Sequence, residues 1–270
     1  MKIKLLIPLL ALLVSVVLSC SKEDNEGIKS TFDTNLDGNA QLKVNLASVY
    51  RSNPQFRIRI NDQIITDPFP AREPYPGGGY NTGGGSSANF LAIPAGNVKV
   101  TVFIPFTKTG SWEDTLRFAQ DSIRIYETTI NVEAGKHYSL HTADTANNFK
   151  NALIEESLAL TNDTLPHFKF VNLMPNVPAL DLYLGTVKVA SNISYLSSSP
   201  EFIIDPTVNT STSWTIRPAG ALPTSTAVAT YSSASTILRG RKYTAFAMGY
   251  SGLSGTSEPR RPFISFYLIR

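Results

Sequence analysis

Three histidines are the side chains best suited to bind a metal ion or to transfer protons near neutral pH. They are His137, His141 and His167. On one face of a strand, the Cβ atoms of His137 and His141 would lie about 13 Å apart, too far to share one metal ion. We expect all three to be structural, and we expect no metal site and no cofactor.

One short segment has the spacing of a calcium-binding loop. Asp33, Asn35 and Asp37 place oxygen ligands at alternate positions, and Gly38 follows at the sixth, as in loops that wrap a hard cation. The twelfth position is Val44, where such loops carry a bidentate acid. A solvated turn competes with calcium binding here, and the sequence leaves that choice open.

A glycine-rich stretch, residues 75–86, could approach an anion through its backbone. It lacks the Lys-Ser/Thr pair and the helix that a phosphate-binding loop needs, so we expect a long hairpin loop. Tyr75 and Tyr80, together with Trp112 in a second predicted loop, are our candidate ligand contacts. Sugar rings stack on exposed aromatic rings, but such rings also occur on surfaces without any ligand.

The sequence contains no recognisable catalytic motif. Residues 249–253, Gly-Tyr-Ser-Gly-Leu, miss the G-x-S-x-G pattern of serine hydrolases. Acidic residues are scattered and follow no motif. We expect a protein that is not an enzyme. The alternative is a glycan-active enzyme whose two carboxylates meet only in the fold.

The single cysteine, Cys20, ends an N-terminal export signal. Two lysines precede an apolar run over residues 5–17, and Ser19 provides the small residue before a cleavage point. This arrangement resembles the lipobox of bacterial lipoproteins, in which the cysteine is acylated and becomes the mature N-terminus. We predict a signal peptide over residues 1–19 and lipidation of Cys20, with an ordinary secretory signal as the alternative.

The polar, mostly acidic segment after Cys20 predicts a flexible, lipidated tether over residues 20–40. A lysine followed by acids there resembles the signal that sends lipoproteins of Bacteroidetes-type bacteria to the outer face of the outer membrane. Without the signal, 22 basic residues face 21 acidic ones, so the basic surface that nucleic acid requires is missing. We expect a lipid-anchored outer-membrane protein, exposed at the cell surface, that meets a glycan or a surface protein.

The rest of the chain predicts β-strands. Apolar and polar residues alternate over residues 56–60 and 98–104, which is typical of strands with one buried face. Residues 152–160 fit a helix or a strand, and we favour a strand. Many short strands between turn signals predict an all-β fold with two tandem immunoglobulin-like antiparallel β-sandwiches, over residues 41–163 and 164–270.

Four short blocks occur twice in the same order, which indicates an internal repeat. Val44–Ala47 returns as Val171–Met174, 56–60 as 180–184, Pro94–Gly96 as Pro218–Gly220, and Ala134–Ser139 as Arg239–Thr244. The last two blocks are about 19 residues farther apart in the first copy. We place that insertion within residues 105–122.

The second copy resembles a known family. Residues 172–184, 214–220 and 240–247 are similar to the bacterial domain-of-unknown-function family numbered 4397, and the resemblance covers essentially all of residues 165–270. It implies an extracytoplasmic, often tandem lipoprotein with an immunoglobulin-like sandwich, and it assigns no activity or site residue. The first copy departs from the pattern, with Arg57 where the second has Asp181.

The sequence therefore predicts a non-catalytic cell-envelope lipoprotein that displays two immunoglobulin-like modules for binding or scaffolding at the cell surface. The alternative is a carbohydrate-binding or glycan-active surface protein with exposed loop aromatics.

Overall fold

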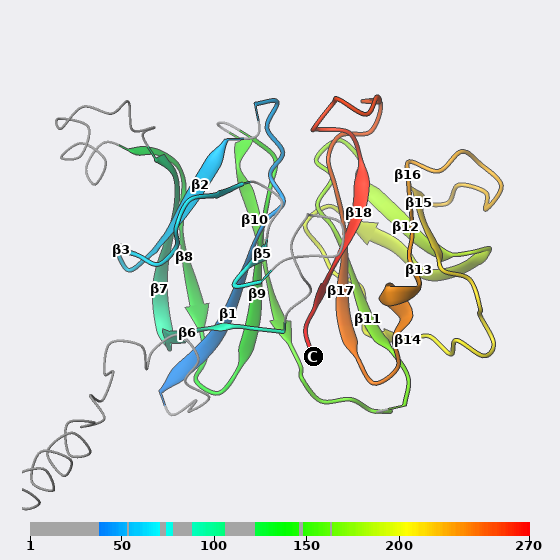
Figure 1. The fold of residues 1–270 in the computed structure, drawn as a ribbon, viewed down its shortest axis with the longest axis horizontal. Helices are drawn as coiled ribbons and strands as arrows, with labels where there is room; N and C mark the ends of the chain where they lie inside the picture. The colour runs from blue at the N-terminus through cyan, green and yellow to red at the C-terminus, as the bar shows by residue number, and fades with distance from the viewer. Residues whose placement is uncertain are drawn as a thin grey trace, which may run out of the picture. The chain divides into compact units, whose positions relative to one another are not determined.

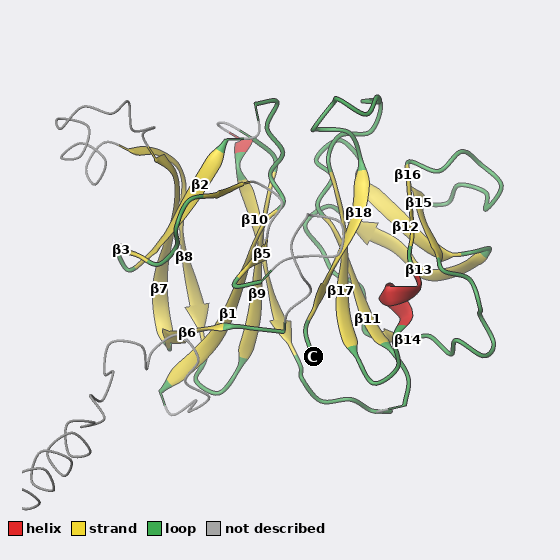
Figure 2. Ribbon diagram, in the orientation of Figure 1, coloured by secondary structure: helices red, strands yellow, loops and turns green. Residues whose placement is uncertain are grey.

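The computed structural model describes residues 38–52, 54–70, 74–77, 88–105, 122–145, 148–162 and 164–270. Their regular structure is almost entirely β-strand, with a short 3-10 helix, η2 (Ala234–Ile237), near the C-terminal end (Figures 1 and 2). The all-β prediction is confirmed. Among these residues, no helix is long and apolar enough to span a membrane.

Below, residues 38–156 are the first half, 157–166 the connector and 167–270 the second half. The strands of the first half are β1 (Asn39–Leu46), β2 (Gln55–Ile60), β3 (Gln63–Ile64), β4 (Phe69–Pro70), β5 (Pro74–Tyr75), β6 (Leu91–Pro94), β7 (Gly96–Pro105), β8 (Ser122–Val132), β9 (His137–Ala143) and β10 (Lys150–Glu156). Those of the second half are β11 (His167–Asn172), β12 (Ala179–Leu184), β13 (Val187–Ser194), β14 (Phe202–Ile203), β15 (Ser213–Pro218), β16 (Ala229–Ser232), β17 (Lys242–Met248) and β18 (Phe263–Leu268).

Each half forms two sheets. The first half has the order β10-β9-β1-β5, with β6 also on β1, and the order β3-β2-β7-β8, with β4 also on β2. The second half has the orders β14-β11-β17-β18 and β13-β12-β15-β16. Most pairs are antiparallel as predicted, but β1 runs parallel to β9 and β11 runs parallel to β17. The predicted antiparallel sandwiches are thus present, with one parallel pair in each half.

A separate hydrophobic core fills each half. In the first half, alternate residues of β1 such as Leu42 and Val44 pack against Ile58 of β2 and Val100 of β7. In the second half, Trp214 of β15 contacts Phe168 of β11 and Phe266 of β18, with ring centroids 5.0 Å and 5.2 Å apart. In each half the two sheets pack face to face, and alternate side chains of their strands fill the space between them. Both halves are therefore β-sandwiches.

A third core lies between the two sandwiches. It joins Ile154 and Ala143 of the first half to Phe246, Met248 and Tyr267 of the second. The sheet that contains β1 and β9 therefore packs on the sheet that contains β11 and β17, and both faces of these inner sheets are covered. All seven residues of β17 are buried, which matches strands that have no solvent face.

Several strand predictions are confirmed. Val98, Val100 and Val102 are fully buried on β7, and residues 150–156 form the strand β10 rather than a helix. The predicted end of the tether at residue 40 is two residues too late, because β1 begins at Asn39 and buries Ala40.

The predicted equivalence of the two Pro-Ala-Gly turns is wrong. Pro94 ends β6 and Gly96 begins β7, whereas Pro218 ends β15. β7 and β15 occupy the same position in their sheets, beside β2 and β12 respectively. The turns therefore lie at opposite ends of corresponding strands, and the insertion length derived from them is not supported.

Candidate functional site

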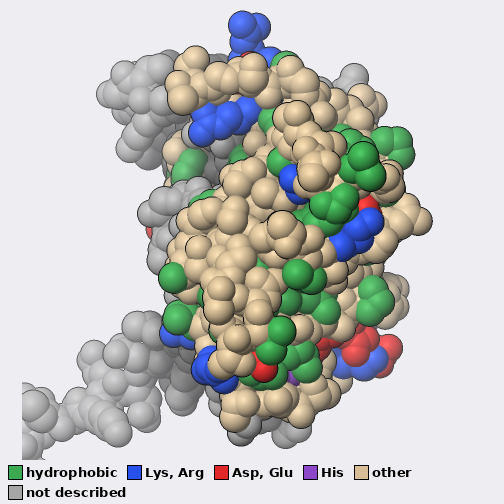
Figure 3. All heavy atoms as spheres, turned by 90° about the vertical axis from the view of Figure 1, so that its right-hand side faces the viewer, with side chains coloured by type: hydrophobic (Ala, Val, Ile, Leu, Met, Phe, Trp, Pro, Cys, Tyr) green, Lys and Arg blue, Asp and Glu red, His purple; other side chains and the backbone are tan. Residues whose placement is uncertain are grey.

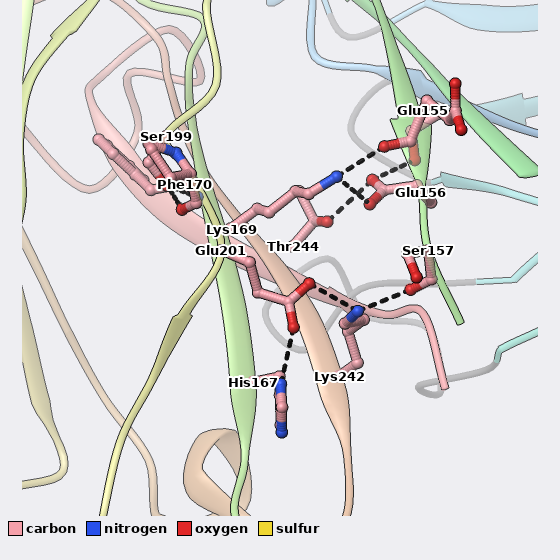
Figure 4. Close-up of polar contacts among 12 residues, drawn as sticks. Glu155, Glu156, Ser157, His167, Lys169, Phe170, Ser199, Glu201, Lys242 and Thr244 are labelled. Carbon is pink, nitrogen blue, oxygen red and sulfur yellow. Dashed lines mark hydrogen bonds and ion pairs between the residues drawn. The ribbon is translucent and has the colours of Figure 1, made fainter. Parts of the chain in front are cut away.

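A polar network lies between the two sandwiches, and we call this region the junction. At its centre is a buried acid, Glu156, at the end of β10. The residue is 3% exposed. Its carboxylate accepts hydrogen bonds from Ser139 Oγ at 2.7 Å and from Thr244 Oγ1 at 3.0 Å, and Lys169 Nζ lies 3.4 Å from Oε2. Figure 4 shows Lys169 and Thr244 reaching this carboxylate from the second half. A buried charge is tolerated when it is paired and hydrogen-bonded in this way.

Lys43 of β1 is the second ionisable group at this junction. Its side chain is fully buried, and Nζ donates to the carbonyl oxygen of Leu268 at 3.0 Å and lies 4.8 Å from the ring centroid of Tyr267. Burial lowers the pKa of Lys43 to about 7, although Glu156 acts in the opposite direction. An amine with such a pKa can act as a base or nucleophile in an enzyme, but here it is enclosed by protein.

His141 of β9 completes the junction. Asn45 Nδ2 lies 3.0 Å from its Nδ1 and the Tyr267 hydroxyl lies 2.8 Å from its Nε2. Burial lowers the pKa of His141 to about 3 and raises that of Tyr267 well above its ordinary value. Both groups are therefore neutral at pH 7, and a neutral imidazole has one donor and one acceptor nitrogen for these two neighbours.

The connector is held by cationic side chains of the second half. Lys242 Nζ is surrounded by three acceptors, namely the carbonyl oxygens of Ser157 at 2.7 Å and Ala159 at 2.9 Å and Glu201 Oε2 at 2.6 Å. Further donors reach other carbonyl oxygens: Arg270 to Leu158 at 2.8 Å, and Arg239 to Thr164 at 3.2 Å. The connector is thus fastened along its backbone rather than left as a free linker.

His167 and Glu201 support this fastening. His167 Nδ1 lies 2.7 Å from Glu201 Oε1, and its Nε2 lies 2.7 Å from the carbonyl oxygen of Asn162 (Figure 4 shows the contact with Glu201). Burial alone would raise the pKa of Glu201, but hydrogen bonds from Lys242 and His167 hold it below its ordinary value. We define Lys242, His167 and Glu201 as the connector clasp.

An open cleft lies near one end of the junction. It has a volume of about 370 Å³ and is lined by Thr145 of the first half and by Asn176, Tyr250, Ser251, Leu253 and Arg260 of the second. The segment between β17 and β18, residues 249–262, supplies most of this lining. Concave sites with a few polar groups are the usual places for small ligands.

A second hollow, of about 360 Å³, lies between the edge strands β13 and β14. Three of its lining residues, Val187, Ile203 and Val208, are 51%, 41% and 83% exposed. Figure 3 faces this side of the molecule and shows hydrophobic side chains as separate green groups among polar ones.

The structure places one of the three aromatic ligand candidates. Tyr75 is half-buried on β5, its ring stacks on Phe69 at 6.2 Å between centroids, and its hydroxyl donates to the carbonyl oxygen of Ile65 at 2.9 Å. Tyr75 thus packs on the core of the first half. Tyr80 and Trp112 lie outside the described residues, as do Cys20 and residues 33–37 of the segment with calcium-loop spacing.

The histidines have no shared site. His141 and His167 are fully buried, and His137 packs edge-on against Phe90. Across the described ranges, no group of three or more metal-ligating side chains comes together.

The sequence analysis missed the junction and the cleft. Lys43, Ser139 and His141 are the polar members of alternating strands, and that pattern assigns them to solvent. Glu156 and Thr244 instead share strand faces with Ile154 and Phe246, and nothing in the sequence shows what those faces pack against. The sequence signal for part of this set was composition: histidine and serine, rather than long charged residues, on the polar face of residues 137–143.

The fold and this junction define an all-β protein built from β-sandwiches. The model of the family described as "Domain of unknown function (DUF4397)" matches residues 80–183 of the chain. This match confirms the family that the sequence motifs indicated. It overlaps the predicted region 165–270 only at residues 165–183, and it includes β7 to β10, so the first half is also recognisably similar to the family.

A crystal structure described as "a putative cell adhesion protein from Bacteroides uniformis ATCC 8492" is similar at 10% identity, with a TM-score of 0.20 over 86% of this chain and 97% of that one. A TM-score of that size does not establish a shared fold. No curated protein matches the chain.

Proposed function

We propose that this chain is a non-catalytic lipoprotein of the cell envelope, anchored in the outer membrane by acylated Cys20, that presents the loops of its β-sandwiches to a partner at the cell surface. The export signal and the single cysteine at its end support the anchor. The tether over residues 20–38 would give the folded part its reach from the membrane.

The observation that carries the presenting role is the sealed junction between the sandwiches. Glu156, Lys43 and His141 are buried, and each is bonded to other groups of the chain. Buried side chains with such partners stabilise the contact between the two modules and are not accessible to a substrate. The two modules thus form a firm support, and the loops at their ends are the parts left to meet a partner.

The test follows the chain in cells. Wild-type protein should fractionate with the outer membrane and be cut by protease added to intact cells, whereas Cys20→Ser should be recovered in the soluble fraction. Mass spectrometry of the N-terminal peptide should show an acylated Cys20. A bare thiol on Cys20, or complete protection of the wild type from protease, would contradict the proposal.

Carbohydrate binding is the second candidate, favoured by the cleft beside Tyr250. Two carboxylates border that cleft: Asp144 is bonded to Tyr250 and Glu258 to Arg260. Hydrogen bonds from Arg260 lower the pKa of Glu258 to about 2, so it remains ionised and is unsuited as the proton donor that glycosidases need. The cleft therefore supports binding over hydrolysis.

A further inference from the structure

We infer that the cleft formed by Thr145 and the segment 249–262 binds a neutral oligosaccharide. This inference deepens the proposed surface role and rests on it, because it names the class of partner that the protein would meet. The segment 249–262 is called the β17–β18 loop below.

The β17–β18 loop is fixed before any ligand arrives. Tyr250 N donates to the carbonyl oxygen of Arg260 at 2.9 Å, and Arg261 Nη1 donates to the carbonyl oxygens of Gly255 and Thr256 at 3.1 and 2.7 Å. At Gly249, an added Cβ would lie 2.3 Å from the carbonyl oxygen of Arg261. A loop held by its own backbone loses little conformational entropy when a ligand binds.

Both halves of the protein contribute to the cleft, and polar contacts fix its walls. Tyr250 of the second half donates its hydroxyl to Asp144 Oδ1 of the first half at 2.6 Å. The side-chain amide of Asn176 donates to the carbonyl oxygen of Ser251 at 2.8 Å and accepts from Ser251 N at 2.9 Å. The cleft therefore depends on the junction that holds the two sandwiches together.

The polar groups at the cleft suit hydroxyl groups, which donate and accept hydrogen bonds at once. Asp144 is an acceptor, Thr145 and Ser251 carry hydroxyls, and the Arg260 guanidinium is a donor. Arg260 Nε and Nη2 donate to Glu258 at 2.8 and 3.1 Å, while Nη1 takes no part in that pair. The ring of Tyr250 and the side chain of Leu253 add an apolar surface, on which the C–H face of a sugar can rest.

The charges at the cleft favour a neutral ligand. The carboxylate of Glu258 is paired with Arg260 and is also attracted by Arg51 of the first half. Asp144 accepts a hydrogen bond from the Tyr250 hydroxyl, and the guanidinium of Arg261 donates to carbonyl oxygens of its own loop. Because these charged groups already have partners within the protein, the cleft is better suited to a neutral ligand than to an ion.

The experiment uses the full mature chain, with Cys20 replaced by serine, on an array of neutral and acidic oligosaccharides, followed by calorimetry with each oligosaccharide bound. Arg260→Met and Tyr250→Ala remove the donor and the ring at the cleft. Tyr250→Phe keeps the ring and loses only the hydroxyl. Arg124→Met is the matched control, because Arg124 forms a similar pair with Glu127 at 3.3 Å on β8. Circular dichroism and melting curves establish that every variant is folded.

We expect neutral oligosaccharides to bind, Arg260→Met and Tyr250→Ala to weaken binding at least tenfold, Tyr250→Phe to weaken it less than Tyr250→Ala does, and Arg124→Met to weaken it less than threefold. Binding that folded Arg260→Met and Tyr250→Ala proteins both retain would overturn the cleft as the site. Binding confined to acidic oligosaccharides, or no binding at all, would overturn the ligand class. None of these results tests the proposed lipid anchor and surface display. That proposal is tested only by the fractionation and protease experiment.

Discussion

The hydroxyl of Tyr267 lies 2.8 Å from Nε2 of His141, although 126 residues separate them in the chain. His141 belongs to β9 of the first half and Tyr267 to β18 of the second. Both side chains are fully buried, so this hydrogen bond crosses the junction without contact with water. The junction is therefore sensitive to any change in the protonation of His141.

The protein should lose stability as the pH falls from 6.5 toward 3. The folded-state pKa of His141 is about 3, below its ordinary value of 6.5, so in this window the unfolded chain binds a proton that the folded chain does not. The free energy of unfolding should fall by up to about 1.4 kcal/mol per pH unit from this residue. Urea unfolding at a series of pH values would measure it. His141→Gln should reduce this slope, and an unchanged slope would contradict the assignment.

Lys43 should affect the stability of the protein in a separate pH range, between pH 7 and 10.5. Its folded-state pKa is about 7 and its ordinary value is 10.5, so the unfolded chain keeps a proton that the folded chain has lost, and stability should rise with pH. Lys43→Met should abolish this rise and should be at least as stable as the wild type at pH 6, where the wild type buries a charge. The control is Lys150→Met, at an exposed lysine on β10. A rise that survives Lys43→Met would contradict the prediction.

Lys242→Met should release the connector. The change removes the donor to Ser157 and Ala159 and leaves Glu201 without its ammonium partner, at a cost of about 3–5 kcal/mol. Chymotrypsin should then cut the connector at Leu158 or Leu160 faster than in the wild type. Glu201→Gln should have a smaller effect of the same kind, because the carbonyl contacts of Lys242 remain.

The matched control for the clasp is Lys136→Met. Lys136 also faces two acceptors, Glu133 at 3.0 Å and Glu155 at 3.1 Å, but its side chain is 37% exposed and it does not touch the connector. Its cleavage pattern should equal that of the wild type. Equal cleavage of Lys242→Met and Lys136→Met would mean that the clasp does not hold the connector.

The strands could be predicted from the sequence because their cores follow a two-residue alternation. Val98, Val100 and Val102 face the core of the first half. The alternation alone predicts which face of the strand they occupy. The same rule failed at Lys43 and His141, since it cannot tell a polar face in water from a polar face against a second sandwich. That difference depends on a contact between strands far apart in the chain.

The cleft was also beyond the reach of the sequence. The segment from Gly249 to Leu253 was considered only as a failed hydrolase motif, because nothing in one sequence shows that Asp144 and Tyr250 meet. The two Pro-Ala-Gly turns were also interpreted wrongly, as equivalent positions of the repeat. Pro94–Gly96 and Pro218–Gly220 are identical in sequence, yet they lie at opposite ends of corresponding strands, since a short turn motif records local backbone shape and not its place in a sheet.

Gly249→Ala should disrupt the β17–β18 loop, and Gly252→Ala provides its matched control. The two glycines have nearly the same positive φ, +92° and +91°, so alanine has a similar backbone cost at each, about 1–2 kcal/mol. At Gly249 the new Cβ would also lie 2.3 Å from the carbonyl oxygen of Arg261, whereas at Gly252 it meets nothing within 4 Å. Gly249→Ala should therefore be less stable than Gly252→Ala by about 1–3 kcal/mol, measured by urea unfolding.

Hydrogen exchange should show faster exchange at Tyr250 N in Gly249→Ala alone, because its bond to Arg260 lies beside the clash. Equal stability of the two variants would mean that the loop can shift to admit the methyl group, and that the cleft is less firmly built than its hydrogen bonds indicate.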